Sequence, residues 1–283
     1  MRNSKNFVTQ LSVLMVLAFA TCAIADTRDE KIAKYIELSG IEKVIDSIPS
    51  QLDAVSSQRL MTSKTPDADK KAIELLKEAF DGQRARKELF NFVTKQIEND
   101  LLLQNLLKWY ESPLAQKIDN EESSSSGADK QADLLQYLTV LQKNPPTRER
   151  IDIIQEVEST IQLSELTTNI VVEIMKGMFK TISLTVPKEK QVELADIEKE
   201  IIKLRPIMKE GLRKQMVLSS FYIYRNLSNA ELREYIAFCK TETGKKEIEI
   251  TGGALSYVLS QWFAVATDKI LAHSETEAEK SKK

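Results

Sequence analysis

The sequence predicts an all-α protein in which two related helical-hairpin units pack into one helical domain. Three observations support this fold class. Apolar residues recur three and four positions apart along most of the chain, which is the spacing of one buried helix face. Ser, Thr, Asn or Asp stands before several of these stretches, where such residues cap helix N-termini. The 283 residues include only 8 Gly and 7 Pro, which leaves little material for the turns between strands.

The first two helices are predicted from their caps and breaks. Thr27 and Glu30 have the spacing of a capping box, in which each side chain bonds the other residue's N–H group. Gly40 should end this first helix. A second helix is expected over Ile41–Met61, and Pro49 should kink or break it.

A long helix is predicted next, from Asp67 or Asp69 to about Ile97, with an interruption at Gly82. Its apolar residues keep the helical spacing on both sides of the glycine. Asn99 then has the character of a cap for a short helix.

The stretch Leu103–Ile118, LQNLLKWYESPLAQKI, predicts a corner between two helices. Ser112 can accept hydrogen bonds from the free N–H groups of the second helix, and Pro113 is tolerated at its first position. A second version of this corner is expected at Leu232–Glu247, where Thr241 supplies the capping hydroxyl.

The middle of the chain begins with a low-complexity linker over Ser123–Gly127. A helix over Ala128–Leu141 should stop at the prolines that follow it, and Thr147 should begin another. The apolar pattern predicts a further helix over Leu163–Leu184.

The last third of the chain should be helical throughout. A long helix is expected over Lys188–Arg225, with local distortions at Pro206 and Gly211. Ser228 should cap Asn229–Lys240.

The final helix carries a strong apolar stripe over Leu255–Ile270, which should pack on the protein's own core, and the tail from His273 should be disordered. The resulting division of the chain is a signal peptide (1–25), a first helical unit (26–122), a Ser-rich linker (123–128), a second helical unit (129–272) and a disordered tail (273–283).

The N-terminus predicts export. Arg2 and Lys5 form a basic start, Leu11–Ala20 is apolar, and the small residues before Asp26 fit cleavage near Ala25. The apolar run is shorter than a membrane-spanning helix, which needs about 18 residues. We therefore expect a periplasmic or secreted protein. A lipoprotein acylated at Cys22 is the less favoured alternative.

Removal of the signal peptide would leave Cys239 as the single cysteine, so no intramolecular disulfide is expected. Cys239 lies on an apolar helix face, which favours a buried and inert thiol.

Charge and motifs exclude several function classes. The formal net charge is −2, and both signs alternate along the chain without a basic stripe, so no nucleic-acid partner is expected. His273 is the only histidine, which argues against a histidine nucleophile or metal site. The sequence holds no phosphate-binding or dinucleotide-binding motif and predicts no cofactor.

The two units align without gaps at an offset of 129 residues, which predicts an internal duplication. The aligned pairs have the same roles in a helix–corner–helix unit, as caps, core aromatics and small residues. The pairs are Gly82 with Gly211, Arg84 with Arg213, Leu89 with Leu218, Phe92 with Phe221, Asn99 with Ser228, Leu103 with Leu232, Trp109 with Phe238, Ser112 with Thr241, Ala115 with Gly244, and Lys117 with Lys246.

The two corners resemble the family of domain of unknown function 2059. The first copy reads Leu-x-x-Trp109-Tyr-Glu-Ser-Pro-Leu-Ala115-Gln-Lys, and the second keeps Phe238 and Gly244-Lys-Lys. The chain departs from the family pattern in one place in copy one, where Ala115 replaces Gly. In copy two, Cys239 and Glu242 replace Tyr and Pro. The resemblance implies an exported bacterial helical protein and brings no activity.

The residues of the two corners are the clearest structural candidates. Trp109 and Phe238 should be core anchors, and the small residues should allow helices to approach closely. The corner residues are Trp109, Ser112, Pro113, Phe238, Thr241 and Gly244.

Two further pairs are candidates for chemistry. Arg84 and Arg213 could contact an anion, but we favour a role in tying acidic residues and carbonyls at the corners. Glu111 with Asp119 could form a general acid/base pair, although acidic residues on helices are more often solvent charges. Glu111, beside the Ser112 cap, is better interpreted as support for the corner, and no catalytic residue is assigned.

We therefore expect a non-enzymatic binding or structural protein of the cell envelope, with a protein or peptide as the candidate partner. The alternatives are a chaperone-like holder of apolar clients and a hydrolase that uses carboxylates alone. A binding protein predicts a groove lined by both units, and a hydrolase predicts two buried acids converging in a cleft. A holder predicts an exposed apolar patch of several hundred Å².

Overall fold

The structure is a computed structural model that describes residues 26–62, 66–125, 130–184 and 193–280. These residues form twelve helices and no strand, so the predicted all-α class is confirmed. The helices are α1 (Arg28–Leu38), α2 (Ile41–Thr62), α3 (Pro66–Ala79), α4 (Gly82–Gln96), α5 (Asp100–Tyr110), α6 (Pro113–Ser124), α7 (Gln131–Lys143), α8 (Arg148–Ile161), α9 (Leu163–Leu184), α10 (Leu194–Ile223), α11 (Asn229–Lys240) and α12 (Glu242–Lys280).

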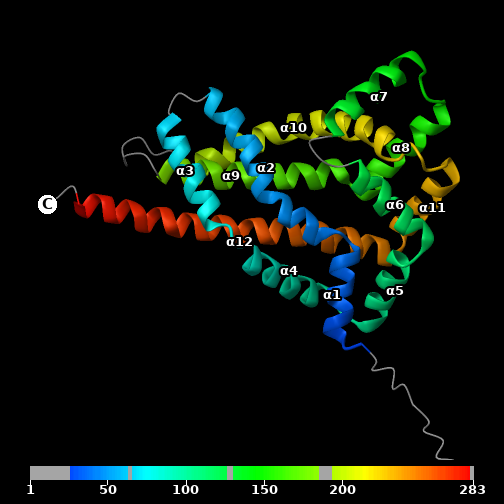
Figure 1. Ribbon diagram of the computed structural model, residues 1–283, viewed down its shortest axis with the longest axis horizontal. Helices are drawn as coiled ribbons and strands as arrows, with labels where there is room; N and C mark the ends of the chain where they lie inside the picture. Colours follow the sequence, from blue (N-terminus) through cyan, green and yellow to red (C-terminus); the bar gives the residue numbers. More distant parts are fainter. Residues whose placement is uncertain (1–25, 63–65, 126–129, 185–192, 281–283) are drawn as a thin grey trace, which may run out of the picture.

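The long helix α12 is the axis of the fold (Figure 1). It packs against α2, α3, α4, α5, α9 and α11. The apolar stripe predicted for this helix supplies the contacts, because Leu255, Val258, Trp262 and Ala266 are all buried. The Trp262 indole also donates a hydrogen bond of 2.9 Å to the Leu76 carbonyl, which anchors α3 on α12.

The helix that follows each corner packs into the core of the other unit. One hydrophobic cluster combines α1, α2, α4 and α5 with Ile250 and Val258 of α12. A second cluster combines α8, α10 and α11 with Ile118 of α6. The predicted units 26–122 and 129–272 therefore exchange α6 and α12, and neither closes its core without the other.

Two ion pairs also join an exchanged helix to the opposite unit. The Nζ atom of Lys117 on α6 lies 2.6 Å from Glu231 Oε1 on α11. The Nζ atom of Lys246 on α12 lies 3.6 Å from Glu98 Oε1, just before α5. The two lysines are one of the pairs at the 129-residue offset. The duplication itself stays a prediction.

The predicted helix boundaries that rest on caps agree with the structure. Thr27 and Glu30 form the capping box of α1, and Gly40 follows that helix with a positive φ of 68°. Ser228 caps α11, and the N–H group of Gly244 donates to Thr241 Oγ1 at 3.0 Å at the start of α12.

Of the four predicted interruptions, the one at Gly82 is confirmed, and the other three positions lie inside continuous helices. The long helix expected from Asp67 or Asp69 is two helices, because α3 ends at Ala79 and Asp81 caps α4 at Gly82. Helix α2 continues through Pro49 without a break. Pro206 and Gly211 likewise lie inside the continuous helix α10.

The predicted tail and linker also change. The backbone of α12 remains helical to Lys280, so the expected disorder from His273 is wrong over that range. Ser123 and Ser124 of the predicted linker belong to α6. Residues 126–129 of the linker region, and the first residues of the helix expected over Lys188–Arg225, lie outside the described residues.

Candidate functional site

A cavity of about 290 Å³ lies where the exchanged helices meet. It takes residues from both predicted units, and we call it the inter-unit cavity. Its lining residues are Ser39, Tyr110, Glu122, Ile161, Leu163, Leu166, Ile223, Tyr224, Tyr235, Glu247, Ile248 and Thr251. The exchanged helices meet here because α6 packs into the core of the second unit and α12 packs into the core of the first.

Glu247 on α12 is held by two hydroxyl groups. Tyr110, the last residue of α5, donates to Glu247 Oε1 at 2.6 Å. Thr251, one turn further along α12, donates to the same oxygen at 2.7 Å. Burial raises the pKa of Glu247, and the two hydroxyl bonds oppose that rise only in part.

Glu122 on α6 is the second carboxyl group of the cavity. Tyr224, which follows α10, donates to Glu122 Oε1 at 2.7 Å. Burial raises the pKa of Glu122 to about 7, against the lowering effect of the Tyr224 bond. The negative charges of Asp119 and Glu247 raise this pKa further. Like charges in a poorly solvated space disfavour ionisation of one another, so the cavity carries a negative potential.

Aromatic rings join the cavity to the corners. Trp109 stacks on Phe238, with 3.8 Å between ring centroids, and lies parallel to Tyr235 at 6.1 Å. Tyr235 meets Tyr224 edge to face at 6.4 Å. Trp109 is half-buried, so it anchors the core from its edge.

Tyr35 on α1 lies behind this wall. Its ring packs against Tyr110 at 5.8 Å, and its side chain is 1% exposed. Burial and the nearby negative charge of Glu247 raise the pKa of its hydroxyl well above the usual value, and its interaction with Thr251 opposes that rise.

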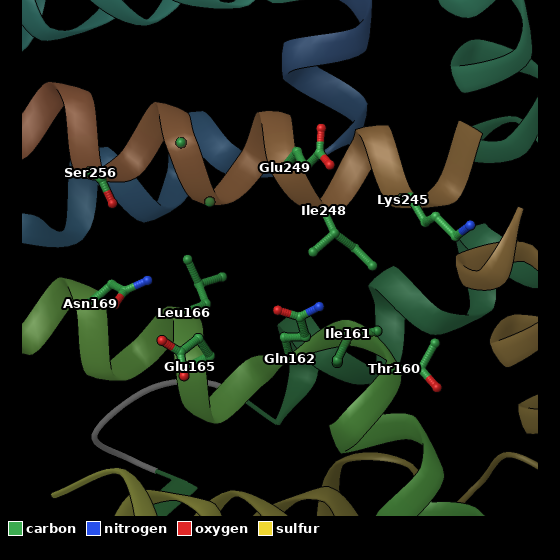
Figure 2. A pocket seen from close by; sticks show the side chains of 12 residues that line it. Thr160, Ile161, Gln162, Glu165, Leu166, Asn169, Lys245, Ile248, Glu249 and Ser256 are labelled. Atoms are coloured by element: carbon green, nitrogen blue, oxygen red, sulfur yellow. The ribbon is translucent and has the colours of Figure 1, made fainter. Parts of the chain in front are cut away.

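A second cavity of about 460 Å³ opens between α9 and α12, and we call it the α9–α12 cavity (Figure 2). Ile161, Leu166 and Ile248 line both cavities, so the two are adjacent. Leu166 and Ile248 extend from the two helices toward the gap between them (Figure 2). The remaining lining residues are Thr160, Gln162, Glu165, Asn169, Lys245, Glu249, Gly252, Gly253 and Ser256.

The charges of the α9–α12 cavity are already paired. Glu165 Oε2 lies 2.5 Å from Lys209 Nζ on α10, and Arg205 bonds its other oxygen. Glu249 pairs with Lys246 at 3.1 Å on its own helix. The negative potential therefore belongs to the inter-unit cavity rather than to its neighbour.

The residues of the two corners lie at helix starts and in the contact between the corners. Ser112 caps α6, with Pro113 at its first position, and Thr241 caps α12. A Cβ atom on Gly244 would stand 2.6 Å from the Cys239 Cα atom and closer still to the Phe238 carbonyl oxygen. The small residue is thus required for the close approach of α11 and α12.

Arg84 and Arg213 are not brought together by any described contact. Arg84 donates to the Ala79 carbonyl at 2.9 Å and tethers the end of α3. Arg213 forms a two-pronged bond to Glu210 on its own helix, at 3.0 Å for each nitrogen. Both guanidinium groups are engaged, and an anion contact stays a prediction.

No described contact joins Glu111 to Asp119, the candidate general acid/base pair. Glu111 is exposed and accepts a hydrogen bond of 2.6 Å from Lys34 Nζ on α1, and its support of the corner stays a prediction. The carboxyl groups that converge are Glu122 and Glu247, which sequence reasoning missed. The available signal was the presence of tyrosines on otherwise aliphatic helix faces.

The described part of the chain contains no group of three or more His, Cys, Asp or Glu residues that could hold a metal ion. None of its helices has a stretch that is long and apolar enough to cross a membrane. Comparison with protein-family models, curated proteins and solved structures gave no match to this chain.

Proposed function

We propose that this chain is an exported, non-enzymatic binding protein of the cell envelope and that the inter-unit cavity is its ligand site. The observation that carries the proposal is the composition of the cavity wall. Both predicted units contribute to it, and its two carboxyl groups, Glu122 and Glu247, are held in place by tyrosine hydroxyls. A concave apolar site with a few convergent polar groups is the usual form of a ligand pocket.

The two carboxyl groups of the cavity are costly to ionise where they lie. Burial raises the pKa of both Glu122 and Glu247, so ionising either one in the folded protein is unfavourable. Groups kept in such an environment are concentrated at functional sites. A purely structural core would be served better by apolar residues of similar size.

The location in this proposal rests on the sequence. The basic start, the apolar run and the small residues near Ala25 support export by a cleaved signal peptide. The resemblance of the two corners to the domain of unknown function 2059 family supports the same location. The contact between Trp109 and Phe238 supports the internal duplication, since the 129-residue offset pairs these positions.

A carboxylate-dependent hydrolase is the second candidate. It is favoured by one observation, namely that Glu122 has a pKa of about 7 and shares its cavity with a second acid. A general acid works best when its pKa lies near the operating pH. Each carboxyl group already accepts a tyrosine hydroxyl bond, however, which favours a fixed binding role over proton transfer.

A chaperone-like holder would use a different surface. Helix α10 exposes Leu204, Ile207 and Leu218, and the Ile207 side chain is 72% exposed. These residues follow helical spacing on one side of the helix. They would form the client-binding face of this third candidate.

The test of the binding proposal is native mass spectrometry of the mature protein purified from its own compartment. We expect a bound small molecule or peptide on the wild type and its loss from Leu163→Phe, which fills the inter-unit cavity. Leu218→Phe, on the exposed face of α10, is the matched control and should keep the ligand. A wild type that carries no ligand and binds nothing in an NMR fragment screen would contradict the proposal. Hydrolysis of an ester or glycoside that Glu122→Gln abolishes would favour the second candidate.

A further inference from the structure

The wall of the inter-unit cavity defines the chemistry of what it can hold. Glu122 and Glu247 both line the cavity, and the negative charge of Asp119 nearby also acts on Glu122. An anionic ligand would add a further like charge to this space and be repelled. A ligand that brings positive charge would instead relieve the cost of ionising the two carboxyl groups.

Tyrosine rings belong to the wall of the same cavity. Tyr110, Tyr224 and Tyr235 all line it, and the first two bind the carboxyl groups through their hydroxyls. Aromatic faces attract organic cations through their negative π-electron density, by about 0.5–2 kcal/mol for each contact. Carboxylates with aromatic neighbours are therefore suited to an ammonium or guanidinium group.

The Tyr35 hydroxyl adds a polar group behind the wall of the cavity. It belongs to a side chain that is 1% exposed, it lies near Thr251 and Glu247, and it does not line the cavity itself. The polar groups of the wall that are fixed in place are therefore Glu122 and Glu247, with the tyrosine hydroxyls that bind them.

The remainder of the cavity wall is apolar apart from Ser39 and Thr251. Leu163 and Ile223 line only the inter-unit cavity, whereas Ile161, Leu166 and Ile248 continue into the α9–α12 cavity. The two spaces measure about 290 and 460 Å³. An apolar body attached to a charged group would extend along these aliphatic side chains.

We propose that the ligand of the inter-unit cavity is an organic amine, with its ammonium group at Glu122 and Glu247 and an apolar body along Leu166 and Ile248. This inference rests on the binding function proposed above and specifies its ligand. A divalent metal ion is a poorer occupant, because Ca²⁺ requires six to eight oxygen ligands. The described residues also contain no group of three candidate metal ligands.

The experiment compares a charged probe with a neutral probe of the same shape. Binding of n-hexylammonium and of 1-hexanol to the full mature chain is measured by ligand-observed NMR near pH 8, where the amine is charged. We expect the ammonium probe to bind at least about tenfold more tightly than the alcohol, as one added charge contact allows. Glu247→Gln should remove most of this preference, because it keeps the acceptor for Tyr110 and removes the charge.

Glu242→Gln is the matched control on the same helix. Its carboxylate is exposed and pairs with Lys245, so the variant should keep the preference for the ammonium probe. Circular dichroism melting of each variant checks that it is folded. If folding fails for Glu247→Gln, then Glu122→Gln provides the same comparison.

Two results would overturn the inference. Equal binding of both probes, unchanged in folded Glu247→Gln, would show an apolar site and leave the binding function standing without its amine specificity. Absence of ammonium binding would overturn the inference as well. In that case the binding function is tested separately by native mass spectrometry. A natural ligand detected on the wild type would still support binding, even though the ligand is not an amine.

Discussion

Trp109 and Phe238 lie face to face, with ring centroids 3.8 Å apart and an angle of 4° between the ring planes. Each residue stands three positions before the capping hydroxyl of its corner, Ser112 or Thr241. The stack therefore joins the two corners directly. It sets the positions from which α6 and α12 cross into the opposite cores.

Replacement of Trp109 by Ala should lower the free energy of unfolding by about 2–4 kcal/mol. Full burial of a large aromatic side chain gives a loss of about 3–5 kcal/mol, and Trp109 is half-buried. Urea denaturation followed by circular dichroism measures the change. An unchanged midpoint would show that the ring is a surface contact.

The stack itself is measured by a double-mutant cycle with Trp109→Ala and Phe238→Ala. Stacked aromatic pairs contribute about 0.5–1.5 kcal/mol beyond the area they bury, so the two losses should add to more than the loss in the double variant. Strict additivity would contradict a direct contact between the two corners.

Gly244→Ala should destabilise the protein strongly, by roughly 3 kcal/mol or more. The new Cβ atom would stand 2.6 Å from the Cys239 Cα atom, and backbone at a capped corner cannot move aside easily. Thermal unfolding measures the loss. A wild-type melting temperature would show that the corner is looser than described.

Gly211→Ala is the matched control for that substitution. Gly211 is exposed inside α10 and has nothing within 4 Å of the position of a Cβ atom. Alanine favours a helix interior over glycine by up to about 1 kcal/mol, so this variant should be as stable as the wild type or more stable.

The parts of the fold that could be predicted are those that depend on neighbours in sequence. Caps at Thr27, Ser112 and Ser228 require only residues within one turn. Gly82 and Gly211, which are equivalent at the 129-residue offset, show where prediction from glycine alone fails. Asp81 has a side chain short enough to cap α4, whereas Glu210 at the same place in the second unit bonds Arg213, and α10 continues.

The candidate site could not be predicted because its bonds join distant parts of the chain. Tyr110 and Glu247 are 137 positions apart, and Tyr224 and Glu122 are 102 positions apart. Only the exchange of α6 and α12 brings these groups together. Periodicity identifies the buried face of a helix, but it does not identify the helix that faces it.

Cys239 should resist labelling in the folded protein. The side chain is 5% exposed, and burial, together with the charges of Glu247 and Glu122, raises the pKa of its thiol to about 12. A rise of about three pKa units lowers the thiolate fraction roughly a thousandfold. Iodoacetamide should therefore react far more slowly with native than with denatured protein, as followed by mass spectrometry. Equal rates would show that the thiol is accessible.

Glu122 should make the folded protein less stable as the pH rises from about 4.5 to about 7. Its pKa is raised from 4.5 in the unfolded chain to about 7 in the folded state, mainly by burial. Between these values the folded protein binds more protons than the unfolded chain, so its free energy of unfolding falls with increasing pH. The total fall attributable to this group is on the order of 3 kcal/mol, because one pKa unit corresponds to about 1.4 kcal/mol.

Glu122→Gln isolates this contribution, because glutamine keeps the acceptor for Tyr224 and does not titrate. The variant should match the wild type near pH 4.5 and become more stable than it above pH 7, as measured by urea denaturation across the range. Glu242→Gln is the control. The pKa of Glu242 is lowered by its bond to Lys245, so its stabilisation is lost only as the pH falls below about 4.5, outside the window of Glu122. Parallel pH profiles for wild type and Glu122→Gln would mean that Glu122 is well solvated, and the negative potential assigned to the cavity would then rest on Glu247 alone.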